Sequence, residues 1–389
     1  MYAELKEKFR QEFGAQAQYI FSAPGRTEIS GNHTDHQHGC VLAAAVDRQT
    51  VAAVAENGTM QVRLRSEGYA LCEMDLNDLS VHPEEAGRTA ALIRGVAAQF
   101  AQFGLKGFDA YVVSNVLSGS GLSSSAAFEV LMGVIFNELT GAGFDPVQLA
   151  RIGQYAENVY FGKPCGLMDQ MACSVGNMIF IDFADSAATV VEPIAFDFGA
   201  TGHSLCIIDS GASHADMTDE YAAITEELKA VCAVFGKAHL REIPEEDFYE
   251  KLAAVRAAAG DRAVCRAIHV YEENKRVAQQ VQALKDNDFA GFLQGVRASG
   301  CSSWRLLQNV IPAGRKERQE VALALALAEK LLCGKGACRV HGGGFAGTIQ
   351  AFVPDEMVES FTAGMDKVLG KGACQVMAIA KAGGSLVEN

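Results

Sequence analysis

The sequence predicts a mixed α/β protein built from two domains, and three observations support this fold class. The chain has 389 residues, more than a single hydrophobic core usually serves. Strand and helix patterns alternate along it; FDAYVVSNV, for example, alternates apolar and polar residues and precedes the apolar helical segment AAFEVLMGVIFNELTG. The pattern starts again near residue 190, so we expect an N-terminal domain over residues 1–190 and a C-terminal domain over residues 191–389.

The expected N-terminal domain begins with an amphipathic helix, MYAELKEKFRQEFGAQ. YIFSAPGRTEI then predicts a strand that enters a turn, and VLAAAVDRQTVAAVAE predicts another strand because it is rich in small and branched residues. The apolar helix that follows FDAYVVSNV should stop at Gly141. A helix containing Glu157, a turn around Pro164 and short strands through MIFIDF complete this half.

The expected C-terminal domain begins with a buried strand, HSLCIIDSG. Long helical segments follow between Asp216 and Lys335. A second glycine cluster, RVHGGGFAGTIQAFV, links two strand-like segments near the end of the chain. The sequence shows no low-complexity linker and no repeat of solenoid length.

Composition and charge exclude several function classes. Hydrophobic residues make up 49% of the chain and charged residues 21%, which is typical of a soluble globular enzyme. The net charge of −14 argues against nucleic acid or an anionic membrane as a partner, because such partners need a basic face. No apolar run reaches the length of a membrane span, and eleven scattered cysteines without zinc-like spacing favour reduced thiols. We expect a cytoplasmic protein that is a monomer or a weak homodimer.

The Gly/Ser stretch GSGLSSSAA favours a phosphate site. A strand, a glycine-rich loop and a helix start together aim backbone N–H groups and a helix dipole at an anion. A capped helix after a flexible turn explains the stretch equally well when it is taken alone. Two further glycine-rich segments, PGRTEISG and HGGGFAG, favour the phosphate site. The expected ATP-binding residues are Gly119, Ser120, Gly121, Leu122, Ser123, Ser124 and Ser125.

Four segments in order resemble the GHMP small-molecule kinases, and within them the galactokinases. APGRTEISGNHTDHQHG is close to the galactokinase pattern PGRxNxIGEHTDYNxG, and GSGLSSSAAFEV is similar to the phosphate loop of the family. HGGGFAG resembles the element TGGGFGG, and ENVYFGKPCGLMDQ resembles the segment with the catalytic aspartate. The resemblance spans residues 23–348 and implies two domains: an N-terminal domain like domain 2 of ribosomal protein S5 and a C-terminal ferredoxin-like domain, with the site between them.

The resemblance implies ATP-dependent phosphorylation of the C1 hydroxyl of galactose. Asp169 matches the aspartate that accepts or orients the hydroxyl proton, and Arg26 matches the arginine paired with it. Ser125 and Glu157 match the pair that holds Mg²⁺, and the twelve residues from Glu157 to Asp169 equal the family spacing. Without this resemblance, Asp169 would be taken for a loop cap and Glu157 for a solvated surface residue.

The resemblance also implies a sugar pocket. His33 and Asp35 match residues that hold the ring hydroxyls, Gly166 gives the sugar access to backbone, and Tyr221 resembles a pocket tyrosine whose usual following arginines are absent here. Asn32 departs from the family pattern because galactokinases carry Glu there, facing the C6 end of the sugar. Plant galacturonokinases also lack that glutamate, and an amide tolerates a C6 carboxylate, so galacturonate is the alternative substrate.

Three other hypotheses compete with the galactokinase interpretation. His33, His36 and His38 lie with Asp35 within six residues, which is also compatible with a transition-metal site. A non-catalytic sensor of sugar and ATP is a second alternative, although such sensors lack residues of the serine loop that are present here. A GHMP kinase for mevalonate, homoserine or a polyol is the third, and the NHTD and GLMDQ segments argue against it.

Overall fold

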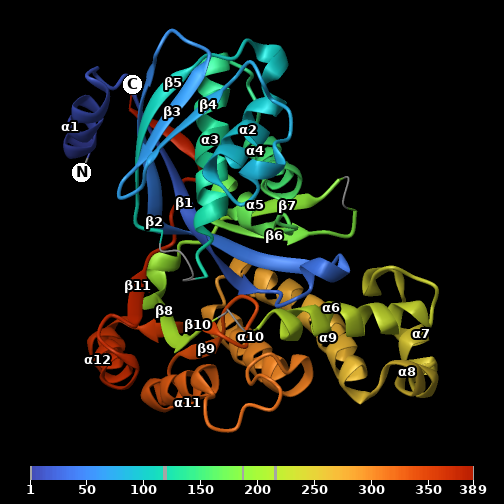
Figure 1. Cartoon of the computed structure of the whole chain (residues 1–389). Helices are drawn as coiled ribbons and strands as arrows, with labels where there is room; N and C mark the ends of the chain where they lie inside the picture. Colours follow the sequence, from blue (N-terminus) through green and yellow to red (C-terminus); the bar gives the residue numbers. More distant parts are fainter. Residues whose placement is uncertain (1, 117–120, 186–187, 214–216, 389) are drawn as a thin grey trace. The chain divides into compact units, whose positions relative to one another are not determined.

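The computed structural model describes residues 2–116, 121–185, 188–213 and 217–388, and it has the mixed α/β fold that the sequence predicts (Figure 1). Internal contacts group the chain into two compact units. Unit 1 comprises residues 1–26, 44–177 and 380–389, and unit 2 comprises residues 27–43 and 178–379. Residues 27–43 and 178–190, which we expected in the N-terminal domain, therefore belong to unit 2. The domain boundary at residue 190 remains a prediction.

Unit 1 contains a sheet with the strand order β12-β1-β2-β5-β3-β4. β2 pairs antiparallel with β5, and β5 pairs parallel with β3. The strands are β1 (Tyr19–Ser30), β2 (Cys40–Glu56), β3 (Gln61–Ser66), β4 (Leu71–Asp75), β5 (Phe108–Ser114) and β12 (Ser385–Glu388); β1 and β2 each continue into unit 2. The helices are α1 (Tyr2–Phe13), α2 (Thr89–Gln99), α3 (Ser124–Thr140), α4 (Pro146–Tyr155) and α5 (Met168–Val175), with a π-helical turn η4 (Ala156–Phe161).

The sequence patterns of α1 and α3 agree with how deeply each helix is buried. α1 places Leu5 and Phe9 against Val51 and Ala53 of β2, as its amphipathic pattern predicts. α3 is buried along most of its length and contacts α2, α4 and α5 (Figure 1). It ends at Gly141, whose φ of 65° gives the left-handed helix end that the sequence predicts.

Unit 2 contains an antiparallel sheet with the strand order β11-β8-β10-β9. The strands of this sheet are β8 (His203–Ala212), β9 (Ala337–Val340), β10 (Gly347–Pro354) and β11 (Cys374–Met377). Unit 2 also contains β6 (Met178–Asp182) and β7 (Val190–Ile194), which are not part of this sheet and form an antiparallel pair. Its helices are α6 (Thr218–Ala233), α7 (Glu245–Glu250), α8 (Leu252–Ala259), α9 (Asp261–Lys285), α10 (Phe289–Ser302), α11 (Glu320–Leu332) and α12 (Val358–Leu369), with short turns η1 (Asp35–Gln37) and η7 (Ser303–Leu307).

Unit 2 contains two hydrophobic clusters among its described residues. Apolar residues of β8, β9 and β10 pack against α11 and α12, and a second cluster joins α6, α8 and α9. The long helical segments predicted between residues 216 and 335 are confirmed as α6 to α11.

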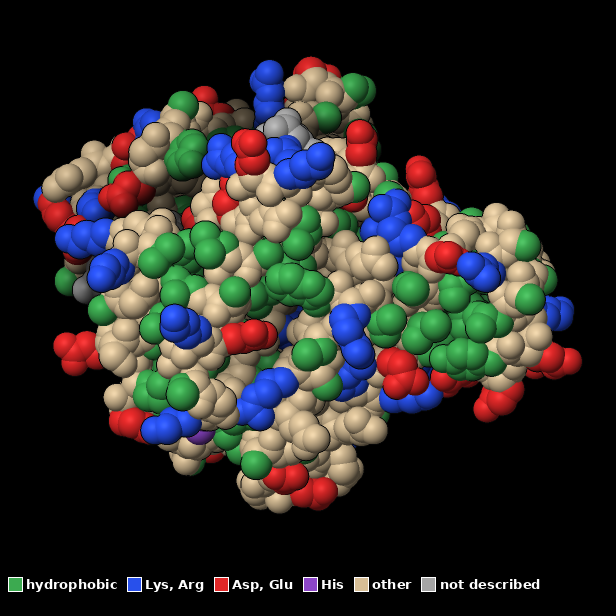
Figure 2. Space-filling view, turned by 90° about the horizontal axis from the view of Figure 1, so that it is seen from below, with side chains coloured by type: hydrophobic (Ala, Val, Ile, Leu, Met, Phe, Trp, Pro, Cys, Tyr) green, Lys and Arg blue, Asp and Glu red, His purple; other side chains and the backbone are tan. Residues whose placement is uncertain are grey.

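Surface and cysteine chemistry agree with the composition. On the face drawn in Figure 2, acidic and basic side chains are interspersed between separate hydrophobic patches. All eleven cysteines lie in the described part of the chain and are free. Among the described residues, we find no helix with the length and apolar character that crossing a membrane requires.

Candidate active site

Asp169 and Arg26 form the ion pair that the motifs predict, although 143 residues separate them. Nε and Nη2 of Arg26 donate to the two carboxylate oxygens of Asp169 at 2.7 and 2.6 Å. Burial acts to raise the pKa of Asp169, but the charge of Arg26 and hydrogen bonds from Arg26 and Ser123 hold this pKa below its ordinary value. The carboxylate is therefore ionised at neutral pH, and 31% of its side chain stays exposed.

Arg26 is itself held by the loop that precedes α3. Its backbone N–H donates to the carbonyl of Leu122 at 3.0 Å, and Nη1 donates to the carbonyl of Gly121. A Cβ atom at Gly25 would lie 2.9 Å from the carbonyl oxygen of Leu122, so glycine is needed where β1 passes this loop. These contacts fix the guanidinium beside the start of α3.

Ser123 occupies the N-cap position of α3, but its hydroxyl does not cap the helix. The residue has a left-handed conformation (φ 57°, ψ 68°) and makes no side-chain cap hydrogen bond to α3. Its Oγ donates instead to Asp169 Oδ2 at 2.7 Å. A left-handed serine costs about 1–3 kcal/mol, and such strain persists only where surrounding contacts maintain it. Gly119 and Ser120, which are also expected in this loop, lie outside the described residues.

Ser125 and Glu157, which match the metal-holding pair of the family, also lie together. Ser125 Oγ donates to Glu157 Oε1 at 3.2 Å, and Lys163 Nζ donates to the same oxygen at 2.9 Å. Glu157 is 2% exposed and belongs to η4, which agrees with the helix expected around it. π-Helical turns occur often at functional sites. A hydroxyl and a single carboxylate fit Mg²⁺, which takes few protein ligands and keeps waters and phosphate oxygens.

Two neighbours of this pair were not singled out from the sequence. Gln170 Nε2 donates to Glu157 Oε2 at 2.9 Å and to Glu129 Oε2 at 2.8 Å. Glu129 is fully buried in α3, and burial first, then the charge of Glu157, raises its pKa to about 8. The signal available in the sequence was an isolated acidic residue inside an otherwise apolar helix.

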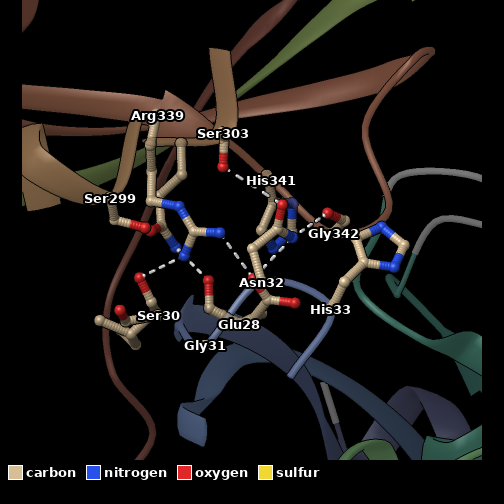
Figure 3. A network of polar contacts seen from close by, with 12 residues as sticks. Glu28, Ser30, Gly31, Asn32, His33, Ser299, Ser303, Arg339, His341 and Gly342 are labelled. Carbon is tan, nitrogen blue, oxygen red and sulfur yellow. Dashed lines mark hydrogen bonds and ion pairs between the residues drawn. The ribbon is translucent and has the colours of Figure 1, made fainter. Parts of the chain in front are cut away.

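Two of the predicted sugar residues of unit 2, Asn32 and His33, contact a glycine turn, Gly342–Gly344; Figure 3 shows both beside Gly342. Asn32 is fully buried, and its Nδ2 donates to the carbonyl of Gly342 at 2.6 Å. His33 Nε2 lies 2.9 Å from the carbonyl oxygen of Gly343. Burial first, then the neighbouring His36, lowers the pKa of His33 to about 4, so its ring is neutral.

Tyr221 supports the same turn from α6. Its hydroxyl donates to the carbonyl of Gly344 at 2.7 Å, and a Cβ at Gly343 would lie 2.6 Å from its ring atom Cε1. The predicted site residues thus fall into two groups. Unit 1 holds Arg26, Gly121, Leu122, Ser123, Ser124, Ser125, Glu157, Gly166 and Asp169, and unit 2 holds Asn32, His33, Asp35 and Tyr221.

The histidine-rich loop does not gather its side chains around one point. Asp35 accepts a hydrogen bond from the backbone N–H of His36, and the ring of His38 stacks on His239 at 3.6 Å. Among the residues that the structure describes, no group of three or more His, Cys, Asp or Glu side chains is arranged to hold a metal ion. The transition-metal alternative therefore gains no support from this loop.

Two family models match segments of the chain that contain predicted site residues. A model described as the GHMP kinases N terminal domain matches residues 91–177, which include the serine loop, Glu157 and Asp169. A model described as the galactokinase galactose-binding signature matches residues 7–56, which include Arg26 and the NHTD segment. A crystal structure of mevalonate kinase has a TM-score of 0.66 at 13% identity, covering 93% of this chain and 99% of that one, so it shares the fold. The fold and the serine loop are those of a GHMP kinase.

Relatives over nearly the whole length specify the family further. A galactokinase of Streptomyces coelicolor is 33% identical over 92% of this chain and 90% of its own length. One from Actinobacillus pleuropneumoniae is 32% identical over 91% of this chain and 90% of its own. A Lactococcus lactis galactokinase solved with galactose covers 100% of both chains, with a TM-score of 0.80 and 25% identity. The chain belongs to the galactokinase family.

Proposed function

We propose that this protein transfers the γ-phosphoryl group of ATP to the C1 hydroxyl of galactose, giving galactose 1-phosphate and ADP. The observation that carries the proposal is the Asp169–Arg26 ion pair beside Ser123 at the start of α3. The galactokinase relatives and the galactose complex of the Lactococcus lactis enzyme support galactose as the sugar.

In this proposal Asp169 acts mainly by orienting the sugar hydroxyl. Both of its oxygens already accept charged or hydroxyl hydrogen bonds, and its pKa is lowered, so it is a weak base. The transition state of phosphoryl transfer is loose, and the hydroxyl proton leaves late, so a weak base suffices to take it. Arg26 keeps the carboxylate ionised and in place, and its positive charge offsets the negative charge that develops at the transferred group.

The start of α3 is the proposed phosphate site. The first backbone N–H groups of a helix have no partner within the helix. Ser123 does not cap them, because its hydroxyl donates to Asp169. Ser125 and Glu157 would hold Mg²⁺, which neutralises charge on the ATP phosphates when it is bound. Lys163 shares an oxygen with Ser125 at Glu157 and balances the charge of this buried carboxylate.

His33 and Asp35 are the proposed ligands of the sugar ring hydroxyls, and Gly166 and Tyr221 are the other residues that we propose bind the sugar. The preference for galactose over galacturonate follows the galactokinases of Streptomyces coelicolor and Actinobacillus pleuropneumoniae, which are similar to this chain over most of its length. We place the protein in the cytoplasm and expect it to act as a monomer or a weak homodimer.

A substrate panel tests the proposed function. Galactose, galacturonate, N-acetylgalactosamine, arabinose and glucose are incubated separately with MgATP, and sugar phosphate is measured. We expect galactose to be the best substrate. Absence of turnover with every hexose and uronic acid would refute the proposal. An Asp169→Asn protein that kept its biological activity while losing turnover would favour the sensor alternative.

A further inference from the structure

The carbonyl groups of the glycine turn Gly342–Gly344 all accept hydrogen bonds from side chains that lie far away in the sequence. The donors come from the loop after β1, from α6 and from the segment after η7. Three of them were predicted as sugar ligands, and the fourth, Asn309, was not. The contacts are Asn32 to Gly342 at 2.6 Å, His33 to Gly343 at 2.9 Å, Asn309 to Gly343 at 3.1 Å and Tyr221 to Gly344 at 2.7 Å.

Asn309 links this turn directly to Asn32. Its Nδ2 donates both to the carbonyl of Gly343 and, at 2.7 Å, to Asn32 Oδ1. Its backbone carbonyl accepts from the N–H of Phe345 at 2.6 Å, and a Cβ at Gly344 would lie 2.2 Å from that oxygen. Asn309 is fully buried, so these contacts are made without competition from water.

The side chain of Asn32 has no hydrogen-bonding capacity left for a ligand. Its two N–H groups donate to Gly342 and to Glu28 Oε1, the second at 3.2 Å, and its oxygen accepts from Asn309 and, at 3.3 Å, from Ser303 (Figure 3). An amide offers two donors and one oxygen with two lone pairs, and all are used. Asn32 is also fully buried.

The partners of Asn32 explain why this position holds an amide. Glu28 Oε1 and the carbonyl of Gly342 are both acceptors, so a carboxylate at position 32 would face two oxygens without a proton to share. Glu28 is fixed in turn by the buried Arg339, whose Nη2 donates to it at 2.7 Å. His269 holds the backbone oxygen of Asn32 at 2.9 Å.

The turn also sets the chemistry of His33. A carbonyl oxygen only accepts hydrogen bonds, so the contact with Gly343 places the proton of the neutral ring on Nε2. Nδ1 is then an acceptor, suited to a sugar hydroxyl. Because Asn309 holds the carbonyl of Gly343, it fixes both the tautomer and the direction of the His33 ring.

We propose that Asn309 is a positioning residue of the sugar site. With Asn32 it forms a clamp that fixes the glycine turn and thereby His33, and position 32 does not read the C6 group of the sugar by direct contact. This inference rests on the proposed function, because it concerns the binding of galactose.

The first test compares Asn309→Ala with the wild type and with Tyr271→Phe. Tyr271 donates one hydrogen bond, to Ile243 at 3.1 Å, away from the glycine turn, so its variant is a matched control for stability. Asn309→Ala should fold, because Asn32 Oδ1 keeps Ser303 and the carbonyl of Gly343 keeps His33. We expect Asn309→Ala to weaken galactose binding by calorimetry and to raise the galactose KM about tenfold, the value of one hydrogen bond, with the ATP KM unchanged.

The second test separates positioning from direct contact with C6. The ratio of kcat/KM for galactose to that for 6-deoxygalactose is measured in the wild type and in Asn32→Ala, with Ser303→Ala as the milder variant if Asn32→Ala does not fold. The clamp predicts lower activity with the same ratio. A ratio that falls toward one in either variant would show that position 32 contacts the C6 hydroxyl and would overturn the proposal.

The outcomes distinguish the clamp from the proposed function. A wild type that binds and phosphorylates galactose while Asn309→Ala behaves like Tyr271→Phe would overturn the clamp alone. A wild type that binds galactose without turnover would overturn the proposed function and leave the clamp to be decided by calorimetry. A wild type that neither binds nor phosphorylates galactose would overturn both.

Discussion

The buried carboxyl of Glu129 makes the stability of unit 1 depend on pH in a direction that follows from its surroundings. Glu129 Oε1 and Gln170 Oε1 are both buried, and neither has a hydrogen-bond partner among the described residues. A proton on Glu129 removes a buried negative charge close to Glu157 and leaves an oxygen to accept from Gln170. Glu129→Gln carries a neutral amide there and reproduces the uncharged form at every pH.

The magnitude follows from the pKa of Glu129, which rises from an ordinary value of 4.5 to about 8 through burial first and then the charge of Glu157. A pKa that is raised by folding contributes stability at low pH that is lost as pH rises from 4.5 toward 8. The free energy of unfolding therefore falls by roughly 5 kcal/mol at most over this pH range, because each pKa unit corresponds to about 1.4 kcal/mol.

Urea unfolding at pH 5.5, 7.0 and 8.5 measures this effect. We expect the wild type to lose stability relative to Glu129→Gln between the lowest and the highest pH, by several kcal/mol. Glu138→Gln is the matched control, because Glu138 lies exposed on the same helix and should follow the wild type. A constant difference between Glu129→Gln and the wild type across the three pH values would refute a protonated Glu129.

Three further substitutions test the two groups of site residues. Arg26→Lys loses the bidentate contact with Asp169, so we expect kcat to fall about a hundredfold with little change in ATP binding. An unchanged kcat would show that the bidentate contact is not needed for phosphoryl transfer. Glu157→Gln removes the charge of a proposed Mg²⁺ ligand, so the Mg²⁺ concentration for half-maximal activity should rise about tenfold; an unaltered Mg²⁺ curve would argue against this residue as a ligand. Gly343→Ala places a methyl group 2.6 Å from the Tyr221 ring and should raise the galactose KM, while Gly199→Ala, where the nearest atom is 3.4 Å away, should not.

The sequence predicted those parts of the site that depend on local patterns. The helix from the serine loop to Gly141 follows from apolar residues and a glycine stop, and both ends were found near the expected positions. The pairing of Arg26 with Asp169 across 143 residues came from the family motifs, because no local pattern connects the two.

Other features depend on distant packing and were not predicted. Asn32 was expected to face the sugar because its motif position does so in the family, but its side chain bonds to Ser303 and Asn309, 271 and 277 residues away. The burial of Glu129 likewise depends on the elements around α3. A single sequence identifies which residues carry polar groups, whereas the partners of a buried group are fixed only when distant segments pack together.

The most direct test of the central claim is phosphoryl transfer by Asp169→Asn, followed as galactose 1-phosphate formed from MgATP and galactose. In this variant the amide replaces one oxygen that accepts from Arg26 or Ser123. Asp145→Asn is the control, because Asp145 caps α4 and Asn caps a helix equally well. We predict that kcat of Asp169→Asn falls by about 10²–10⁴ while galactose binding is kept; an Asp169→Asn enzyme with the kcat of Asp145→Asn would contradict the role of Asp169.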